Sequence, residues 1–217
     1  MHVIALRGVN LQRSPAAIPV PDPLAEVHYR IDVAEGRIVD VRWRPSPHRD
    51  ARPDGSDLEL IIIHGISLPP GVFGTPWPEA LLAGAALPEE AWVGEDLRTL
   101  QVSAHLLINR KGETVQFVPF HERAWHAGRS LWRGRTACND FAVGIELEGA
   151  DDVPYTDAQY ISLASVVRSL RTAYPSLAHA PLVAHSDVAP GRKTDPGPAF
   201  LWTRLAEVLV RAARVRA

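Results

Sequence analysis

LELIIIH, residues 58–64, is the stretch that decides the fold of this 217-residue chain. Its apolar run is too continuous for a strand with one face in water, so we predict a central strand that is buried on both faces. His64 stands at the carboxyl end of this strand. Ligands of open sheets with parallel strands gather outside that end. The stretch therefore predicts both a sheet and a functional position at its edge.

Two further short apolar stretches carry polar groups. The stretch 141–147 places Glu146 between two apolar neighbours, and Glu is rarely buried without a partner. We expect the Glu146 side chain to point into a cleft, and the alternative is that its strand lies at the edge of the sheet. The stretch 182–184 predicts a short strand that delivers His185.

The segment AHSDVAPGRKTDPG, residues 184–197, holds His185, Lys193 and Asp195 within eleven positions. Its prolines and glycines predict a shaped loop rather than a helix or a strand. Neutral imidazole and carboxylate are good zinc ligands, and an ammonium group stabilises a developing negative charge. The alternative is a surface turn whose polar side chains cap their own backbone.

These positions together form one candidate site. His64, His185 and Asp195 are the candidate metal ligands. Three protein ligands leave the fourth tetrahedral position of zinc to water, which is the arrangement of a catalytic site. Lys193 and Glu146 then supply charge stabilisation and proton transfer.

The other reactive side chains favour structural roles. We expect His105 and His126 to be hydrogen-bonded core or pocket-wall residues, and Cys138 to be a small buried hydrophobe rather than a nucleophile. A zinc-binding His-Glu-x-x-His motif is absent. His121 and His126 are five positions apart and would diverge on a helix.

The rest of the chain shows clear secondary-structure signals. Thr156 and Gln159 form a capping-box pattern at the start of the firmest helix. The long excursion over 65–100, with Trp77 and Trp92, is expected to supply apolar walls to the site. In chain order we predict a hairpin over 27–43, a short helix over 81–86, a hairpin over 102–119, a helix over 156–174 and a helix from 198 onward.

The composition excludes several classes of protein. A content of 46% hydrophobic residues allows one substantial core. A formal charge of −2 gives no field that would gather nucleic acid or an anionic membrane. We find no apolar run of roughly 20 residues and no secretory signal in residues 1–20, and a single cysteine fits a reducing compartment. We expect a soluble cytoplasmic protein, and we expect a monomer although the sequence does not determine the oligomeric state.

Six motifs, in this order and spacing, resemble the zinc-dependent amidase-2 family, and within it the 1,6-anhydro-N-acetylmuramyl-L-alanine amidases. They are IIIHGISLPPGVFG (61–74), VSAHLLINRKGETVQFVPF (102–120), RAWHAG (123–128), CNDFAVGIELEG (138–149), YTDAQY (155–160) and AHSDVAPGRKTDPGPAF (184–200). The resemblance spans roughly residues 46–204. It implies an α/β (α+β) fold with a central mixed β-sheet flanked by helices, as in peptidoglycan-recognition proteins. We expect residues 1–43 to form an N-terminal extension with a β-hairpin, and residues 44–217 to form the zinc amidase domain.

The resemblance also implies the roles of five residues. His64, His185 and Asp195 take the positions of the family's ligands to one Zn²⁺, while Glu146 and Lys193 take the positions of its catalytic Glu and Lys. The implied substrate is a small anhydro-muropeptide. The implied reaction is hydrolysis of the amide between its lactyl group and L-alanine, in cell-wall recycling.

Three departures from the family pattern concern substrate binding. Gly65 stands where the family often has Asn, and Gln101 and Ala137 stand where relatives often carry Arg. We expect them to change substrate affinity and peptide preference and to leave the reaction intact. Two other functions compete with this one: an amidase acting on intact peptidoglycan, and a muropeptide-binding module without catalysis.

Overall fold

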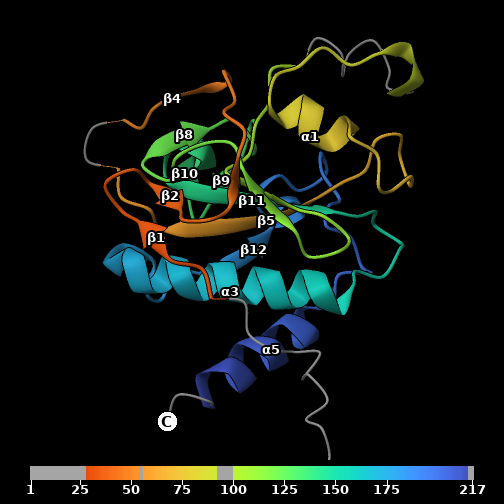
Figure 1. Ribbon diagram of the computed structural model, residues 1–217. Helices are drawn as coiled ribbons and strands as arrows, with labels where there is room; N and C mark the ends of the chain where they lie inside the picture. The colour runs from red at the N-terminus through yellow and green to blue at the C-terminus, as the bar shows by residue number, and fades with distance from the viewer. Residues whose placement is uncertain (1–27, 54–55, 92–99, 215–217) are drawn as a thin grey trace, which may run out of the picture.

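The computed structural model describes residues 28–53, 56–91 and 100–214. It is built on a six-stranded mixed sheet with helices on both sides (Figure 1), as the sequence predicts. The four strands at one side run parallel, the fifth runs antiparallel to the fourth, and the sixth is parallel to the fifth. In spatial order the strands are β12 (Leu182–Ala184), β5 (Leu60–Ile66), β11 (Ala142–Glu148), β6 (Leu106–Ile108), β7 (Thr114–Gln116) and β3 (Arg42–Trp43).

Strand β5 lies inside the sheet and is buried on both faces, which confirms the prediction. Ile61 and Ile63 pack in the cluster that includes the helical residues of 160–170, while Leu60 and Ile62 pack in a separate cluster. All four side chains are 0% exposed. Because successive side chains of a strand alternate between faces, His64 points to the same face as Leu60 and Ile62.

Helix α3 (Asp157–Ala173) covers one face of the sheet, and α5 (Trp202–Arg214) packs on α3 from outside (Figure 1). The predicted capping box is present: the Thr156 hydroxyl accepts the Gln159 N–H at 3.2 Å, and the Gln159 amide oxygen accepts the Thr156 N–H at 3.1 Å. The helix predicted over 156–174 is confirmed, whereas the helix expected from residue 198 begins at Trp202.

Helix α1 (Trp77–Leu82) lies on the other side of the sheet (Figure 1), and the prediction of a helix over 81–86 is wrong. Pro78 suits the first turn of the helix, because N–H groups there have no partner within the helix and the missing N–H of proline costs nothing. Gly84, at φ 72°, ends the helix in a left-handed conformation.

The expectation of a loop throughout 184–197 is also wrong, because residues after β12 form the short helix α4 (His185–Val188). The Asp187 carboxylate accepts the Ala184 N–H at 2.8 Å at its start. This bond satisfies a backbone donor that a helix start leaves free, and it fixes His185 in the first turn.

The N-terminal hairpin is shorter than predicted. Strands β1 (Ile31–Asp32) and β2 (Arg37–Ile38) pair antiparallel, but Asp40, at φ 64°, interrupts the second strand. The chain then enters β3, an edge strand of the main sheet. Residues 1–27 and Trp92 lie outside the described residues, and the domain boundary after residue 43 stays a prediction.

Smaller elements complete the described chain. The hairpin predicted over 102–119 is β6 with β7, joined through residues 109–113. Two further antiparallel ribbons pair β4 (Arg49–Ala51) with β8 (Glu122–Ala124), and β9 (Leu131–Trp132) with β10 (Arg135–Thr136). Three short 3-10 helices are η1 (Glu89–Ala91), η2 (Cys138–Asp140) and η3 (Pro175–Leu177). Within the described ranges, the structure contains no helix that is both long and apolar enough to cross a membrane.

Candidate metal centre and active site

Strand register brings three candidate residues together at the carboxyl ends of the parallel strands. His64 of β5 is the direct partner of Glu146 of β11. On the other side of β5, Ala184 is the partner of Ile63, so His185 follows at the level of His64. Strand β11 lies between β5 and β6, so Glu146 is on an inner strand, in a cleft, and the edge-strand alternative is wrong.

Three potential ligand atoms lie close together at these strand ends. The Nδ1 atoms of His64 and His185 are 3.0 Å apart, and Asp195 Oδ2 lies 3.4 Å from the first and 3.1 Å from the second. Zinc ligands at 2.0–2.1 Å in a tetrahedron are separated by roughly 3.3 Å. The spacing of the three atoms therefore fits one small metal ion.

The electrostatics suit the forms in which these residues ligate metals. Burial lowers the pKa of His64 to about 4, so its imidazole is neutral. Burial alone would raise the pKa of Asp195, but hydrogen bonds to His185 and His64 outweigh it and hold that pKa below its usual range. Neutral imidazole and charged carboxylate are the forms that bind metal ions.

Glu146 lies beside this group with an unsatisfied atom. Its Oε1 is 3.9 Å from His64 Nδ1, and its Oε2 is buried without a hydrogen-bond partner among the described residues. Burial and the charge of Asp195 raise the pKa of Glu146 well above its ordinary value, against the lowering effect of Lys193. A buried polar atom without a partner needs an explanation, and a ligand or a reacting water would provide one.

The site opens into a cavity of about 160 Å³. Lys193 lines it beside the metal-ligand candidates, and Leu81 and Leu82 of α1 supply apolar wall, as expected of the 65–100 excursion. Trp77, by contrast, is not among its lining residues. The described residues that line it are Gly65, Ile66, Leu68, Leu81, Leu82, Leu100, Val102, Ser103, His126, Glu146, His185, Lys193 and Asp195.

Gly65, one of the departures from the family pattern, lies in a confined position. Its N–H faces Asp195 Oδ2 at 3.4 Å, and a Cβ added to it would lie 2.5 Å from the Tyr155 hydroxyl. Tyr155 in turn donates to the Pro196 carbonyl at 3.0 Å and so holds the segment that carries Asp195. The other two departures, Gln101 and Ala137, are exposed and do not line the cavity.

His105 and His126, which were expected to be core or pocket-wall residues, are placed as predicted. His105 and His126 are both buried, and burial lowers the pKa of His105 to about 3. His105 bonds the Gly144 N–H at 3.0 Å, whereas His126 lines the cavity. Cys138 is buried, as expected.

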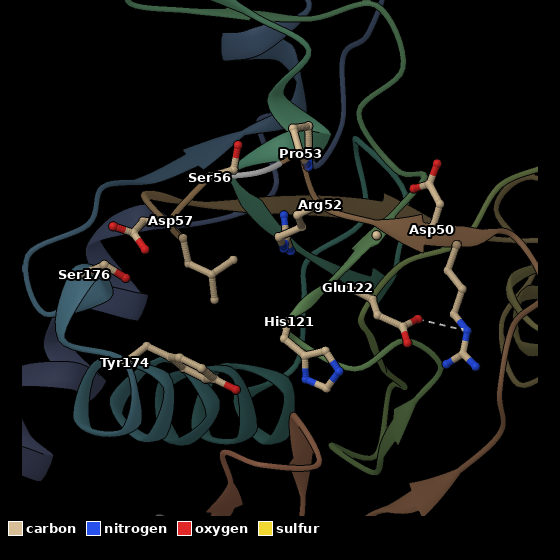
Figure 2. A pocket seen from close by; sticks show the side chains of 12 residues that line it. Asp50, Arg52, Pro53, Ser56, Asp57, His121, Glu122, Tyr174 and Ser176 are labelled. Carbon is tan, nitrogen blue, oxygen red and sulfur yellow. Dashed lines mark ion pairs between the residues drawn. The ribbon is translucent and has the colours of Figure 1, made fainter.

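A second, larger cavity of about 770 Å³ is lined in part by Arg52 (Figure 2). Arg52, which sequence reasoning missed, donates to the main-chain carbonyls of Phe120, Asn139, Asp140 and Ala142. Burial lowers its pKa to about 10. Its partners lie 68 to 90 positions away, so no local signal could have identified it. The lining residues are Arg49, Asp50, Ala51, Arg52, Pro53, Ser56, Asp57, Leu58, His121, Glu122, Tyr174 and Ser176.

Comparison with known proteins identifies relatives over most of the chain. The family model of N-acetylmuramoyl-L-alanine amidases matches residues 54–198. The chain is 54% identical over 170 residues to the 1,6-anhydro-N-acetylmuramyl-L-alanine amidase AmpD of Escherichia coli strain K12, which covers 78% of this chain and 92% of that protein.

Solved structures of amidases are similar to this chain as well. A crystal structure of a selenomethionine derivative of AmpD superposes with a TM-score of 0.76 at 48% identity, covering 82% of this chain and 99% of that one. The amidase AmiD from E. coli, solved in complex with the substrate anhydro-N-acetylmuramic acid-L-Ala-D-γ-Glu-L-Lys, superposes with a TM-score of 0.52 at 29% identity, covering 83% of this chain and 65% of that one.

Proposed function

The chain belongs to the N-acetylmuramoyl-L-alanine amidase family, and on that premise we propose that it is a zinc-dependent 1,6-anhydro-N-acetylmuramyl-L-alanine amidase of cell-wall recycling. It hydrolyses the amide between the lactyl group of the anhydro-sugar and L-alanine. The observation that carries the proposal is the convergence of two Nδ1 atoms and one carboxylate oxygen within 3.0–3.4 Å, next to an unpaired buried Glu146 oxygen.

His64, His185 and Asp195 would hold the metal ion. Two imidazoles and one carboxylate are a catalytic zinc donor set that leaves a position for water or substrate. Zinc bound there supplies a Lewis acid that polarises a carbonyl and acidifies water.

Glu146 is the general base of the proposed reaction. Its carboxylate takes a proton from the attacking water and passes it to the alanine amine as the amide C–N bond breaks. A base works best when its pKa lies near the pH of the reaction, and the raised pKa of Glu146 moves in that direction.

Lys193 stabilises the negative charge that develops on the carbonyl oxygen. Lys193 lines the same cavity as His185 and Asp195, and fixed positive charge at a developing oxyanion is an effective source of rate acceleration. Leu81 and Leu82 of α1 give the same cavity an apolar wall.

The substrate is a small muropeptide, and we place the reaction in the cytoplasm. The single cysteine, Cys138, cannot form an internal disulfide, which suits that compartment.

The test pairs metal analysis with an assay of peptide release. Purified protein is expected to contain close to one zinc per chain and to release peptide from an anhydro-muropeptide. It should lose this activity on chelation and regain it on addition of zinc. Intact peptidoglycan is assayed beside it and is expected to be a poorer substrate.

A matched pair of histidine variants supplies the control. His185→Ala is expected to lose both zinc and activity, whereas His121→Ala, in the lining of the larger cavity, should keep both. Full activity in metal-free protein would disprove the zinc mechanism, and a preference for intact peptidoglycan would disprove the substrate.

A further inference from the structure

The motif RAWHAG, residues 123–128, has no part in the mechanism above, yet it touches both candidate ligand histidines. His126 contacts the ring of His64, and the Ala127 carbonyl contacts the ring of His185. In each case the contact is made to Nε2, the nitrogen that faces away from the ligand cluster.

His64 is held by a side chain. Its Nε2 lies 3.0 Å from His126 Nδ1, and the two side chains are buried, with 1% and 7% exposure. A neutral imidazole carries one N–H and one lone pair. For Nδ1 of His64 to offer a lone pair to a metal ion, its proton must be on Nε2, where His126 Nδ1 accepts it.

His185 is held by the main chain. Its Nε2 lies 3.2 Å from the Ala127 carbonyl oxygen. A carbonyl only accepts, so when His185 Nδ1 gives its lone pair to a metal ion, the proton of His185 is on Nε2 and is donated to this carbonyl. Adjacent residues thus orient both ligand rings with Nδ1 inward.

The surrounding chain keeps this segment in place. The Asn139 side-chain oxygen accepts the N–H groups of His126 and Ala127 at 3.2 and 2.8 Å. Gly144 of β11 leaves room for the His126 ring, because a Cβ added there would lie 2.3 Å from His126 Cγ. Any other residue at position 144 would displace the ring from His64.

We propose that His126 is a positioning residue of the metal centre, which fixes the tautomer and ring orientation of His64 while the Ala127 carbonyl does the same for His185. The proposal rests on the metal site of the proposed function and adds residues that support the ligands. Such outer contacts typically change metal affinity about 10–100-fold when they are removed.

The test measures zinc affinity rather than activity. Metal-free protein is titrated with zinc in competition with a chromophoric chelator, at one pH above 7. His126→Leu removes the acceptor and is expected to weaken zinc binding about 10–100-fold. His126→Asn places an amide oxygen near the position of Nδ1 and is expected to restore most of the affinity, which a purely structural role would not predict.

His105 provides the matched control. It is a buried histidine whose ring lies 5.7 Å from that of His126, but its nitrogens bond Gly144, Glu122 and Arg52 rather than a ligand. His105→Gln is expected to lower the melting temperature and to leave zinc affinity unchanged.

Gly144→Ala tests the same contact with His126 intact, and it is expected to weaken zinc binding in the same way. The inference is overturned if wild-type protein binds zinc and both His126→Leu and Gly144→Ala bind it equally well. If wild-type protein binds no zinc and His64→Ala changes nothing, the metal centre of the proposed function fails, and this inference fails with it.

Discussion

The cavity that Arg52 helps to line is several times larger than the cavity beside Glu146, about 770 Å³ against about 160 Å³, yet we propose that the reaction takes place in the smaller one. Arg52 is a partly buried cation whose N–H groups are used by main-chain carbonyls. Glu146 is a buried carboxylate with an oxygen that has no partner among the described residues. The kind of groups in the lining, rather than its volume, distinguishes the two cavities, because only the smaller one is lined by Glu146, Lys193 and two of the candidate metal ligands.

The largest expected effect is in the small cavity, at the proposed general base Glu146. Glu146→Gln keeps the shape of the side chain and removes the base, so kcat is expected to fall about 10²–10⁴-fold. Zinc content should stay at the wild-type value, because Glu146 is outside the ligand set. Steady-state kinetics with metal analysis on the same preparation would check this, and turnover at the wild-type rate would remove Glu146 from the mechanism.

The neighbouring cation gives the next largest effect. Lys193→Ala is expected to lower kcat about 10²–10³-fold, as the loss of an oxyanion donor does. The effect falls on kcat more than on KM because the charge acts mainly in the transition state. The contrary result would be a raised KM with normal kcat, which would make Lys193 a binding residue.

A substitution in the lining of the large cavity is expected to change the stability of the protein and not its turnover. Arg52→Met removes a donor from four main-chain carbonyl groups, two of which belong to the buried residues Phe120 and Ala142, and each buried group left unsatisfied costs about 1–3 kcal/mol. We expect a loss of about 3 kcal/mol or more in the free energy of unfolding, measured by urea denaturation. Activity per folded molecule should stay within about twofold, and a specific loss of kcat would erase the contrast between the two cavities.

The pH dependence of stability links the two regions through His105, which bonds Arg52 on one side and Gly144 on the other. Its pKa is about 3 when folded and about 6.5 when unfolded. The native state therefore binds fewer protons between these values, and stability falls as pH falls below about 6.5. At pH 5 the loss is about 2 kcal/mol. Urea denaturation of metal-free protein at pH 8, 6.5 and 5 should show a shallower slope in His105→Gln, and an unchanged slope would contradict the assignment.

The smallest effect is expected at the rim of the large cavity. Arg49 and Glu122 form an ion pair of 3.0 Å, drawn as a dashed line in Figure 2, with side chains about one third exposed. Solvent-exposed pairs contribute about 0.2–1 kcal/mol. Arg49→Gln should therefore change the free energy of unfolding by less than about 1 kcal/mol, and a loss as large as that of Arg52→Met would show that the rim carries the cavity's stability.

Local patterns were sufficient to predict the strand ends and the long helix. The apolar run before His64 and the capping box at Thr156 each act within a few residues, and both were confirmed. The predicted position of α1 was wrong, although its signals are local. The prediction relied on the apolar residues, whereas Pro78 and Gly84 mark the start and the end of the helix more reliably.

Contacts between distant segments could not be predicted. Nothing near Arg52 reveals that its acceptors are carbonyls 68 to 90 positions away. His126 could be assigned to a pocket wall, but its contact with His64 depends on Gly144 of a third segment. The register that pairs His64 with Glu146 likewise belongs to the sheet and not to either strand alone.

Strand β12 lies at the edge of the sheet, and this position affects how easily it opens locally. This three-residue strand is bonded to β5, and His185 follows it directly. An ion shared by His185 and His64 would tie the edge strand to the centre of the sheet across 121 positions of chain. Amide hydrogens of β12 should therefore exchange with solvent faster in the metal-free protein than in the zinc-loaded protein, which makes their exchange a direct report on whether the site is filled.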